Sequence, residues 1–202
     1  MARGILVVIE GIDGSGKTTV ANAVVRALNS FGYRAVYTRE PTSSKFFEAF
    51  EEYIEEFGCD PLIEVLAMAI DRAYHVTRII MPLLERGFIV VTDRYIYSSI
   101  AYQSVVGASI DWIKAVNSFV PMPDIAIYLD VPLDVALNRI RDRSSHRLKH
   151  FEFVNRLSKV VEVYRKLVAE GLMIAIDATD SIEIVTQRCL DIVLRVVEGR
   201  HR

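Results

Sequence analysis

The chain has 202 residues, of which 51% are hydrophobic and 25% charged, and its formal net charge is −2 at pH 7. This balance is typical of one globular domain over residues 1–202, and it speaks against general affinity for nucleic acid or anionic membranes. No apolar run approaches the roughly 18 residues that span a bilayer, and the N-terminus lacks a signal-peptide layout, so we expect a cytoplasmic protein.

Short apolar runs rich in β-branched residues alternate along the chain with helical patterns. Strands are expected over residues 5–10, 34–39, 88–93, 125–131 and 172–177. These runs are apolar on both faces, which is typical of buried parallel strands. Helices are expected over 17–31, 44–57, 61–86 with an interruption at Pro82, 96–105, 109–119, 132–142, 151–170 and 181–198. The alternation predicts an α/β fold of three layers, with a parallel sheet between helices.

The stretch GIDGSGKTT directly follows the first expected strand and opens the first expected helix. It fits the pattern GxxxxGK[ST], in which backbone N–H groups and a helix N-terminus surround a phosphate chain. Lys17 would reach the β- and γ-phosphates, and the Thr18 hydroxyl would hold Mg²⁺. We therefore expect a nucleoside triphosphate here. Its phosphates would be bound by Gly11, Ile12, Asp13, Gly14, Ser15, Gly16, Lys17, Thr18 and Thr19.

Charged residues stand where later strands are expected to end. Asp93 ends the run FIVVTD, where it could position Mg²⁺ or its waters, and Arg94 follows it. Arg39 lies in TREP after the second strand, and Arg72 lies in DRAYH on a helix whose other face is apolar. Ligands bind beyond the carboxyl ends of parallel strands. Arginines clustered there suit a second, acceptor phosphate, because the guanidinium fork matches its oxygens.

Taken together, IEGIDGSGKTT, TREP, DRAYH, TDRYIYSSIAYQ and PDIAIYLDVP resemble the thymidylate kinase family in order and spacing. The resemblance runs from about Ile5 to Ile140 and more loosely to the C-terminus, and the DRY-x2-S-x2-AYQ stretch is specific to that family among P-loop kinases. It implies Mg²⁺-dependent transfer of the ATP γ-phosphate to dTMP, giving dTDP and ADP. It also implies a five-stranded parallel sheet, a mobile lid and usually a homodimer packed through helices.

The resemblance further implies roles for single residues. Asp13 would lie near the acceptor phosphate and the metal. Arg39 and Arg94 would bind that phosphate, whereas Arg72 would reach the pyrimidine edge. Tyr102 would stack near the sugar, where a ring disfavours a ribose 2′-hydroxyl. The other residues implied in the acceptor pocket are Pro41, Met68, Ser98, Ser99 and Gln103, and the implied metal-binding residues are Thr18 and Asp93.

The stretch RIRDRSSHRLKH, residues 139–150, resembles the lid of the group that supplies a catalytic arginine from there. Some family members carry a basic residue next to the P-loop aspartate, whereas Gly14 and Ser15 follow Asp13 here, so the lid arginines are the candidates to replace that cation. The family usually carries acids in this lid, whereas residues 146–149 read HRLK. The expected catalytic residues are Asp13, Lys17, Arg94, Arg141, Arg143 and Arg147.

Met68 stands where family members commonly have a phenylalanine that stacks on thymine. Methionine is adaptable but offers no flat surface. Phe46, Phe47 or Tyr74 could supply a ring instead. If none does, we expect a softer base pocket that accepts other pyrimidines, dUMP included.

Three functions fit the sequence. The first is a dTMP kinase. The second is a kinase of another pyrimidine monophosphate or of a deoxynucleoside, although Arg39 and Arg94 speak against a neutral hydroxyl acceptor, which needs a general base rather than a phosphate clamp. The third is a nucleotide-binding regulatory protein without turnover, which the altered lid motivates and the intact P-loop opposes.

Overall fold

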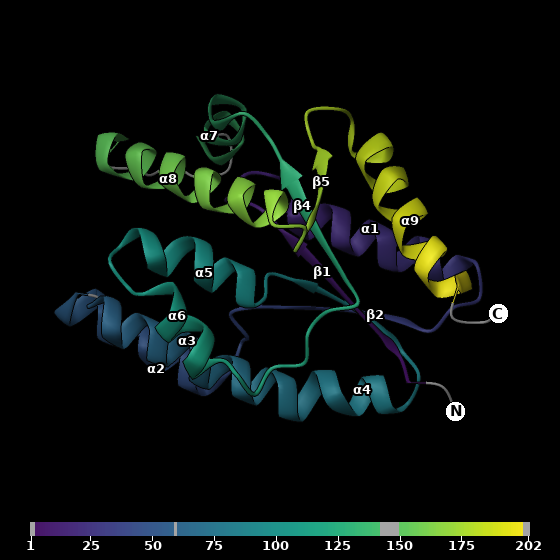
Figure 1. Cartoon of the computed structure of the whole chain (residues 1–202), viewed down its shortest axis with the longest axis horizontal. Coiled ribbons are helices and arrows are strands. Elements are labelled where there is room, and N and C mark those ends of the chain that lie inside the picture. The colour runs from purple at the N-terminus through teal and green to yellow at the C-terminus, as the bar shows by residue number, and fades with distance from the viewer. Residues whose placement is uncertain (1–2, 59, 142–149, 200–202) are drawn as a thin grey trace.

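The computed structural model of the chain describes residues 3–58, 60–141 and 150–199. Within them, five parallel strands form one sheet in the order β2-β3-β1-β4-β5 (Figure 1). The strands are β1 (Ile5–Glu10), β2 (Ala35–Arg39), β3 (Ile89–Asp93), β4 (Ile125–Asp130) and β5 (Ile174–Asp177). Because all five run in one direction, their carboxyl ends share one edge, as the predicted α/β fold requires.

Helices cover both faces of the sheet (Figure 1). On one face, α1 (Lys17–Ser30) packs against α9 (Ile182–Gly199). On the other, α5 (Ile96–Val105) packs against α8 (His150–Ala169) and α3 (Pro61–His75). The remaining α-helices are α2 (Lys45–Phe57), α4 (Met81–Glu85), α6 (Ile110–Val116) and α7 (Leu133–Arg141). Among the helices so described, none is long and apolar enough to cross a membrane.

The strands differ in burial according to their place in the sheet. Almost every residue of β1, β3 and β4 is buried, as predicted. In β2 and β5 most residues are partly or fully exposed, so the prediction of burial on both faces is wrong there. The reason is positional, because β2 and β5 are the two edges of the sheet and have a strand on one side only.

The expected helix over residues 61–86 is not interrupted at Pro82. α3 continues into a π-helical turn, η1 (Val76–Ile80), and then into α4. In this wider turn the Met81 N–H donates to the Val76 carbonyl. Pro82 falls in the first turn of α4, a position that tolerates its missing N–H. The prediction of a break failed because the π turn shifts the hydrogen-bond pattern ahead of the proline.

Candidate active site

The loop between β1 and α1 has a backbone that glycine alone adopts easily. Gly11, Gly14 and Gly16 have φ angles of 151°, 81° and 95°, in or near the left-handed region. A Cβ on Gly14 would collide with the carbonyl oxygen of Ala136 in α7. Lys17, only 6% exposed, closes the loop by donating from Nζ to the Ile12 carbonyl at 2.8 Å.

A pocket of about 340 Å³, here called the phosphate pocket, opens in front of this loop. The P-loop residues lining it adjoin residues at the ends of β2 and β3. Arg39 is exposed and makes no ion pair with another described residue, so its charge is available to a ligand. The lining residues are Asp13, Gly14, Gly16, Lys17, Thr18, Thr19, Arg39, Glu40, Pro41, Glu51, Asp93 and Arg94. The structure thus gathers most of the residues predicted to bind phosphate around one cavity, whereas Gly11, Ile12 and Ser15 do not line it.

Arg94 joins the P-loop to the end of β3. Its φ of 71° is uncommon for a residue with a side chain, and its N–H donates to the Ile9 carbonyl at 3.0 Å. Nη2 contacts Asp13 Oδ1 at 2.5 Å, and the guanidinium lies 4.9 Å from the centre of the Tyr102 ring. Burial raises the pKa of Asp13, but the charges of Arg94 and Lys17 outweigh it and hold that pKa below the usual value.

Thr18 and Asp93 form a pair that fits Mg²⁺. The Thr18 hydroxyl donates to Asp93 Oδ2 at 2.5 Å. Asp93 is buried, and its Oδ1 has no hydrogen-bond partner within the described ranges. Hydroxyl and carboxylate oxygens are ligands that Mg²⁺ prefers, commonly one or two of them beside waters and phosphates. Among described residues, no group of three or more His, Cys, Asp or Glu side chains could hold a metal.

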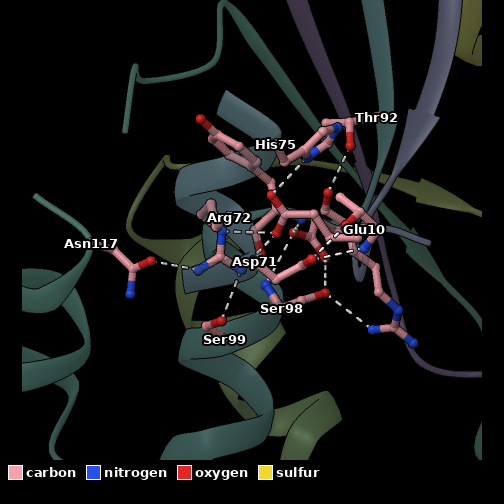
Figure 2. Close-up of polar contacts among 12 residues, drawn as sticks. Glu10, Asp71, Arg72, His75, Thr92, Ser98, Ser99 and Asn117 are labelled. Carbon is pink, nitrogen blue, oxygen red and sulfur yellow. Dashed lines mark hydrogen bonds and ion pairs between the residues drawn. The ribbon is translucent and has the colours of Figure 1, made fainter. Parts of the chain in front are cut away.

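Glu10 is fully buried and contacts Ser98 (Figure 2). Oε1 accepts from the N–H groups of Tyr95 and Ser98 at 2.8 and 3.0 Å, and Oε2 accepts from the hydroxyls of Ser98 and Tyr164 at 2.6 and 2.9 Å. Burial raises the pKa of Glu10, although its donors and the charge of Arg94 act in the other direction. Since Ser98 Oγ also accepts from Arg94 Nη1 at 3.1 Å, Glu10 helps to fix the arginine.

Arg72, predicted to reach the acceptor base, is 2% exposed and held mainly by protein groups (Figure 2). Nε donates to Glu40 Oε2 at 2.8 Å, and Nη1 donates to Asn117 Oδ1 at 2.6 Å. Nη2 donates to the Tyr95 carbonyl at 3.2 Å and to Ser99 Oγ at 2.9 Å. These four bonds engage four of the five N–H groups that an arginine carries. One N–H, on Nη1, has no partner among the residues that the structure describes.

Four further contacts hold β2 and the segment after it against α3. Glu40 Oε1 contacts His75 Nδ1 at 3.0 Å, and His75 Nε2 contacts Thr38 Oγ1 at 2.7 Å. Asp71 accepts from the N–H and the hydroxyl of Thr42 at 2.7 and 2.5 Å. The motifs TREP and DRAYH are therefore partners in space, which their sequence separation does not reveal.

A second cavity of about 130 Å³, here called the base pocket, shares Glu40, Pro41 and Arg94 with the phosphate pocket. It contains every residue predicted for the acceptor pocket except Arg39, which lies in the phosphate pocket. Glu40 and Glu64 also line it, and neither was predicted to bind the acceptor. The lining residues are Glu40, Pro41, Glu64, Met68, Arg72, Arg94, Ser98, Ser99, Tyr102 and Gln103.

None of the rings proposed to replace the missing phenylalanine lines the base pocket. Phe46 and Tyr74 are 40% and 47% exposed. Phe47 packs on Phe50, in a small buried cluster whose edge Met68 covers. Met68 therefore separates this cluster from the base pocket.

A third cavity of about 260 Å³, here called the α9 pocket, lies on the other side of the P-loop. Arg139 of α7 spans it, donating to the Gly14 carbonyl at 3.4 Å and the Ala178 carbonyl at 3.2 Å. Ser15, Gly16 and Thr19 belong to the predicted P-loop, but the pocket itself was not predicted, because its other lining residues come from separate segments without a motif. They are Ser15, Gly16, Thr19, Val20, Arg139, Ala178, Asp180, Ile182 and Val185.

The predicted lid falls largely outside the described residues. Arg141 is the last residue of α7 and is exposed. Arg143 and Arg147 lie in the stretch 142–149, which the structure does not describe. Their catalytic role stays a prediction.

Comparison with known proteins agrees with this geometry. Residues 9–189 match the family model described as thymidylate kinase. A probable thymidylate kinase of Staphylothermus marinus is 38% identical over 192 residues, covering 95% of this chain and 96% of that protein. One from Pyrococcus horikoshii is 43% identical over 171 residues, 82% and 80% of the two chains. The thymidylate kinase of Xylella fastidiosa strain M12 is 36% identical over 197 residues, 98% and 90% of the two chains.

Proposed function

The chain belongs to the thymidylate kinase family, and on that premise we propose that it transfers the γ-phosphate of ATP to dTMP, giving dTDP and ADP. One observation carries the proposal, namely that Arg94 lines both the phosphate pocket and the base pocket. A pyrimidine monophosphate whose base fills the second pocket would have its phosphate between Arg94 and Arg39, opposite the P-loop. Two phosphates held in line in this way are the main requirement of phosphoryl transfer.

The donor would bind on both sides of the P-loop. Its phosphates would lie against the loop backbone and Lys17. The α9 pocket directly beside it offers the apolar side chains of Val20, Ile182 and Val185 and the flat guanidinium of Arg139. These groups suit an aromatic base, because planar cations and apolar side chains both pack on its faces. We assign this pocket to the adenine of ATP.

In the transfer, an oxygen of the acceptor phosphate attacks the γ-phosphorus, and the bond to the β–γ bridging oxygen breaks. Lys17 would bind the migrating phosphoryl group from the donor side, and Arg94 would hold the acceptor phosphate, oriented by Asp13 and Ser98. Mg²⁺, held by Thr18 and Asp93 or their waters, would supply charge neutralisation. No general base is required, because a phosphate oxygen is already ionised at neutral pH.

Tyr102 is proposed to favour a deoxyribose. Its hydroxyl accepts from the Asp13 N–H at 3.2 Å, which fixes the ring at the boundary between the two pockets. Arg94 lies against the same ring. A sugar placed between base and phosphate would meet this immobilised ring, which leaves little room for a 2′-hydroxyl.

We further propose that a second copy of the chain covers the outer face of α3. Leu62, Leu66, Ile70 and Tyr74 recur at intervals of four and are 42–55% exposed, forming an apolar stripe. The family resemblance supports a homodimer packed through helices. Light scattering should give twice the chain mass for the wild-type protein. The double variant Leu66→Glu, Ile70→Glu should give the mass of a single chain. A monomeric wild-type protein at micromolar concentration would refute the dimer.

The activity is tested by ADP release with Mg²⁺ and ATP, scanning dTMP, dUMP, dCMP, UMP and thymidine as acceptors. We expect rapid turnover with dTMP and none with thymidine, which offers no phosphate to Arg39 and Arg94. Absence of acceptor-dependent ADP release, in protein that binds ATP, would favour the regulatory function instead.

A further inference from the structure

Gln103 places an unpartnered acceptor in the base pocket. The residue lies on α5 and is 4% exposed. Its Nε2 donates to Glu64 Oε1 at 2.8 Å, whereas its Oε1 is buried and has no hydrogen-bond partner in the part of the chain that the structure describes. Buried acceptors without a donor are rare and costly. Because Gln103 lines the base pocket, the acceptor base is the natural group to supply one.

Glu64 determines whether the NH₂ group or the carbonyl oxygen of the Gln103 amide remains without a protein partner. An ionised carboxylate only accepts hydrogen bonds, so the NH₂ group must face Glu64 and the carbonyl oxygen must face away. Arg156 of α8 lies 3.6 Å from the same Glu64 oxygen. The amide is therefore held in one of its two orientations by a neighbour, not by the ligand.

Arg72 and Ser99 supply donors in the same pocket. One N–H on Arg72 Nη1 has no partner among the described residues, and Ser99, whose oxygen already accepts from Arg72, keeps its own hydroxyl proton to donate. A base that satisfies these donors and the Gln103 acceptor must offer a donor beside an acceptor. Thymine and uracil do so with N3–H and O4. Cytosine reverses this order, with a bare N3 beside the N4 amino group.

We propose that Glu64, by fixing the Gln103 amide, makes the base pocket select pyrimidines that carry a proton on N3 and reject cytosine. Gln103 touches the base, and Glu64 is a positioning residue that acts through it. The inference rests on the proposed function, since it presumes that the acceptor base occupies this pocket. It predicts no discrimination between dTMP and dUMP, whose hydrogen-bonding edges are the same.

The test is Glu64→Gln, which keeps the side-chain shape but can either donate or accept. Gln103 can then turn its amide and present NH₂ to the pocket. The ratio of kcat/KM for dTMP over dCMP should fall at least about tenfold, roughly the value of one hydrogen bond. The change should appear mainly in KM, with kcat for dTMP nearly constant. An unchanged ratio overturns the inference.

Two variants keep the result interpretable. Arg156→Gln removes the ion pair but leaves the carboxylate, so the selectivity ratio should stay at the wild-type value. A loss equal to that of Glu64→Gln would show that Glu64 acts by anchoring α8, and would overturn the proposal. Gln103→Leu removes the acceptor itself and should lower the ratio even if Glu64→Gln folds poorly.

Binding measurements separate this inference from the proposed function. Calorimetry with dTMP and dCMP, without ATP, reports base selection independently of turnover. Tighter binding of dTMP than of dCMP that Glu64→Gln diminishes would support the inference, even in protein that transfers no phosphate. Equal turnover of dTMP and dCMP by the wild-type protein would overturn the inference and leave the phosphotransferase intact.

Discussion

The phosphate pocket and the base pocket meet at Arg94 but are built by different means. The phosphate pocket is made largely from one contiguous loop, whose shape is fixed by glycines at positive φ. The base pocket is assembled mainly from side chains of α3, of α5 and of the segment that follows β2, held in place by buried charges (Figure 2). Changes in the first should therefore act on the chemical step through single residues. Changes in the second should act on acceptor binding and be shared across a network.

The largest effect is expected from Lys17→Met. Removing a preorganised cation at the migrating phosphate should lower kcat by about 10²–10³-fold. The fold should persist, because the variant removes a buried charge and keeps the length of an apolar stem. Binding of dTMP, measured by calorimetry, should change little. A comparable loss of dTMP affinity would break the proposed division between the two pockets.

Arg94→Lys tests the boundary itself. Lysine keeps the charge but cannot contact Asp13 and Ser98 together as the guanidinium does. We expect kcat/KM for dTMP to fall roughly 100-fold, in line with about 2–3 kcal/mol for a charged hydrogen-bonded contact. The Kd of ATP should stay within a few-fold. An ATP affinity that falls as steeply as dTMP turnover would contradict the assignment of Arg94 to the acceptor.

The same contrast explains what the sequence could predict. The strands and most helices were predicted to within a few residues, because apolar periodicity is a local signal. The P-loop was found for the same reason, since backbone conformation and function coincide in one stretch. The exposure of the two edge strands was not predicted, because burial there depends on strand order and not on the run of residues.

Other parts of the candidate site could not be predicted, because their residues gain their roles from partners that are distant in the sequence. Glu10 stands in a recognisable motif, yet only the fold brings it under Ser98 and Tyr164. Glu64 carries no signal beyond its helical position, and its contact with Gln103 spans 39 residues. The α9 pocket likewise joins three separate segments.

Glu10→Gln should have an intermediate effect on activity and a pH-dependent one on stability. In the variant, the NH₂ group of the new glutamine faces groups that donate to Glu10 in the wild type. Ser98, and Arg94 which donates to it, should therefore shift. We expect kcat/KM for dTMP to fall roughly tenfold, in line with the loss of one hydrogen bond. Because burial raises the pKa of Glu10 above the ordinary value of 4.5, the carboxyl group stays protonated in the folded protein at pH values where it ionises in the unfolded chain. The contribution of Glu10 to the free energy of unfolding of the wild type therefore decreases as the pH rises from about 4.5 to the raised pKa.

Glu10→Gln lacks this titration. Its free energy of unfolding should therefore increase relative to that of the wild type as the pH rises from about 4.5. Urea unfolding of both proteins from pH 4 to pH 8 measures the difference. Tyr164→Phe, which removes one donor and leaves the carboxylate, is the control and should keep the wild-type direction. If the free energy of unfolding of Glu10→Gln instead fell relative to the wild type with rising pH, the hydrogen bonds to Glu10 would lower its pKa by more than burial raises it.

The smallest effect is expected from Met68→Phe, which alters the base pocket alone. Base–aromatic stacking is worth about 1–3 kcal/mol, and Met68 is backed by Phe47 and Phe50, so a ring there would be supported from behind. At the lower end of that range, KM for dTMP should fall about fivefold while kcat stays constant. Met68→Leu is the control for shape without a ring. Selectivity for dTMP over dUMP should rise with the ring, because a rigid surface holds the methyl-bearing base in one position. An unchanged KM for dTMP together with an unchanged selectivity for dTMP over dUMP would show that Met68 does not contact the base. Tyr102 would then be the aromatic side chain of the pocket to test for that contact.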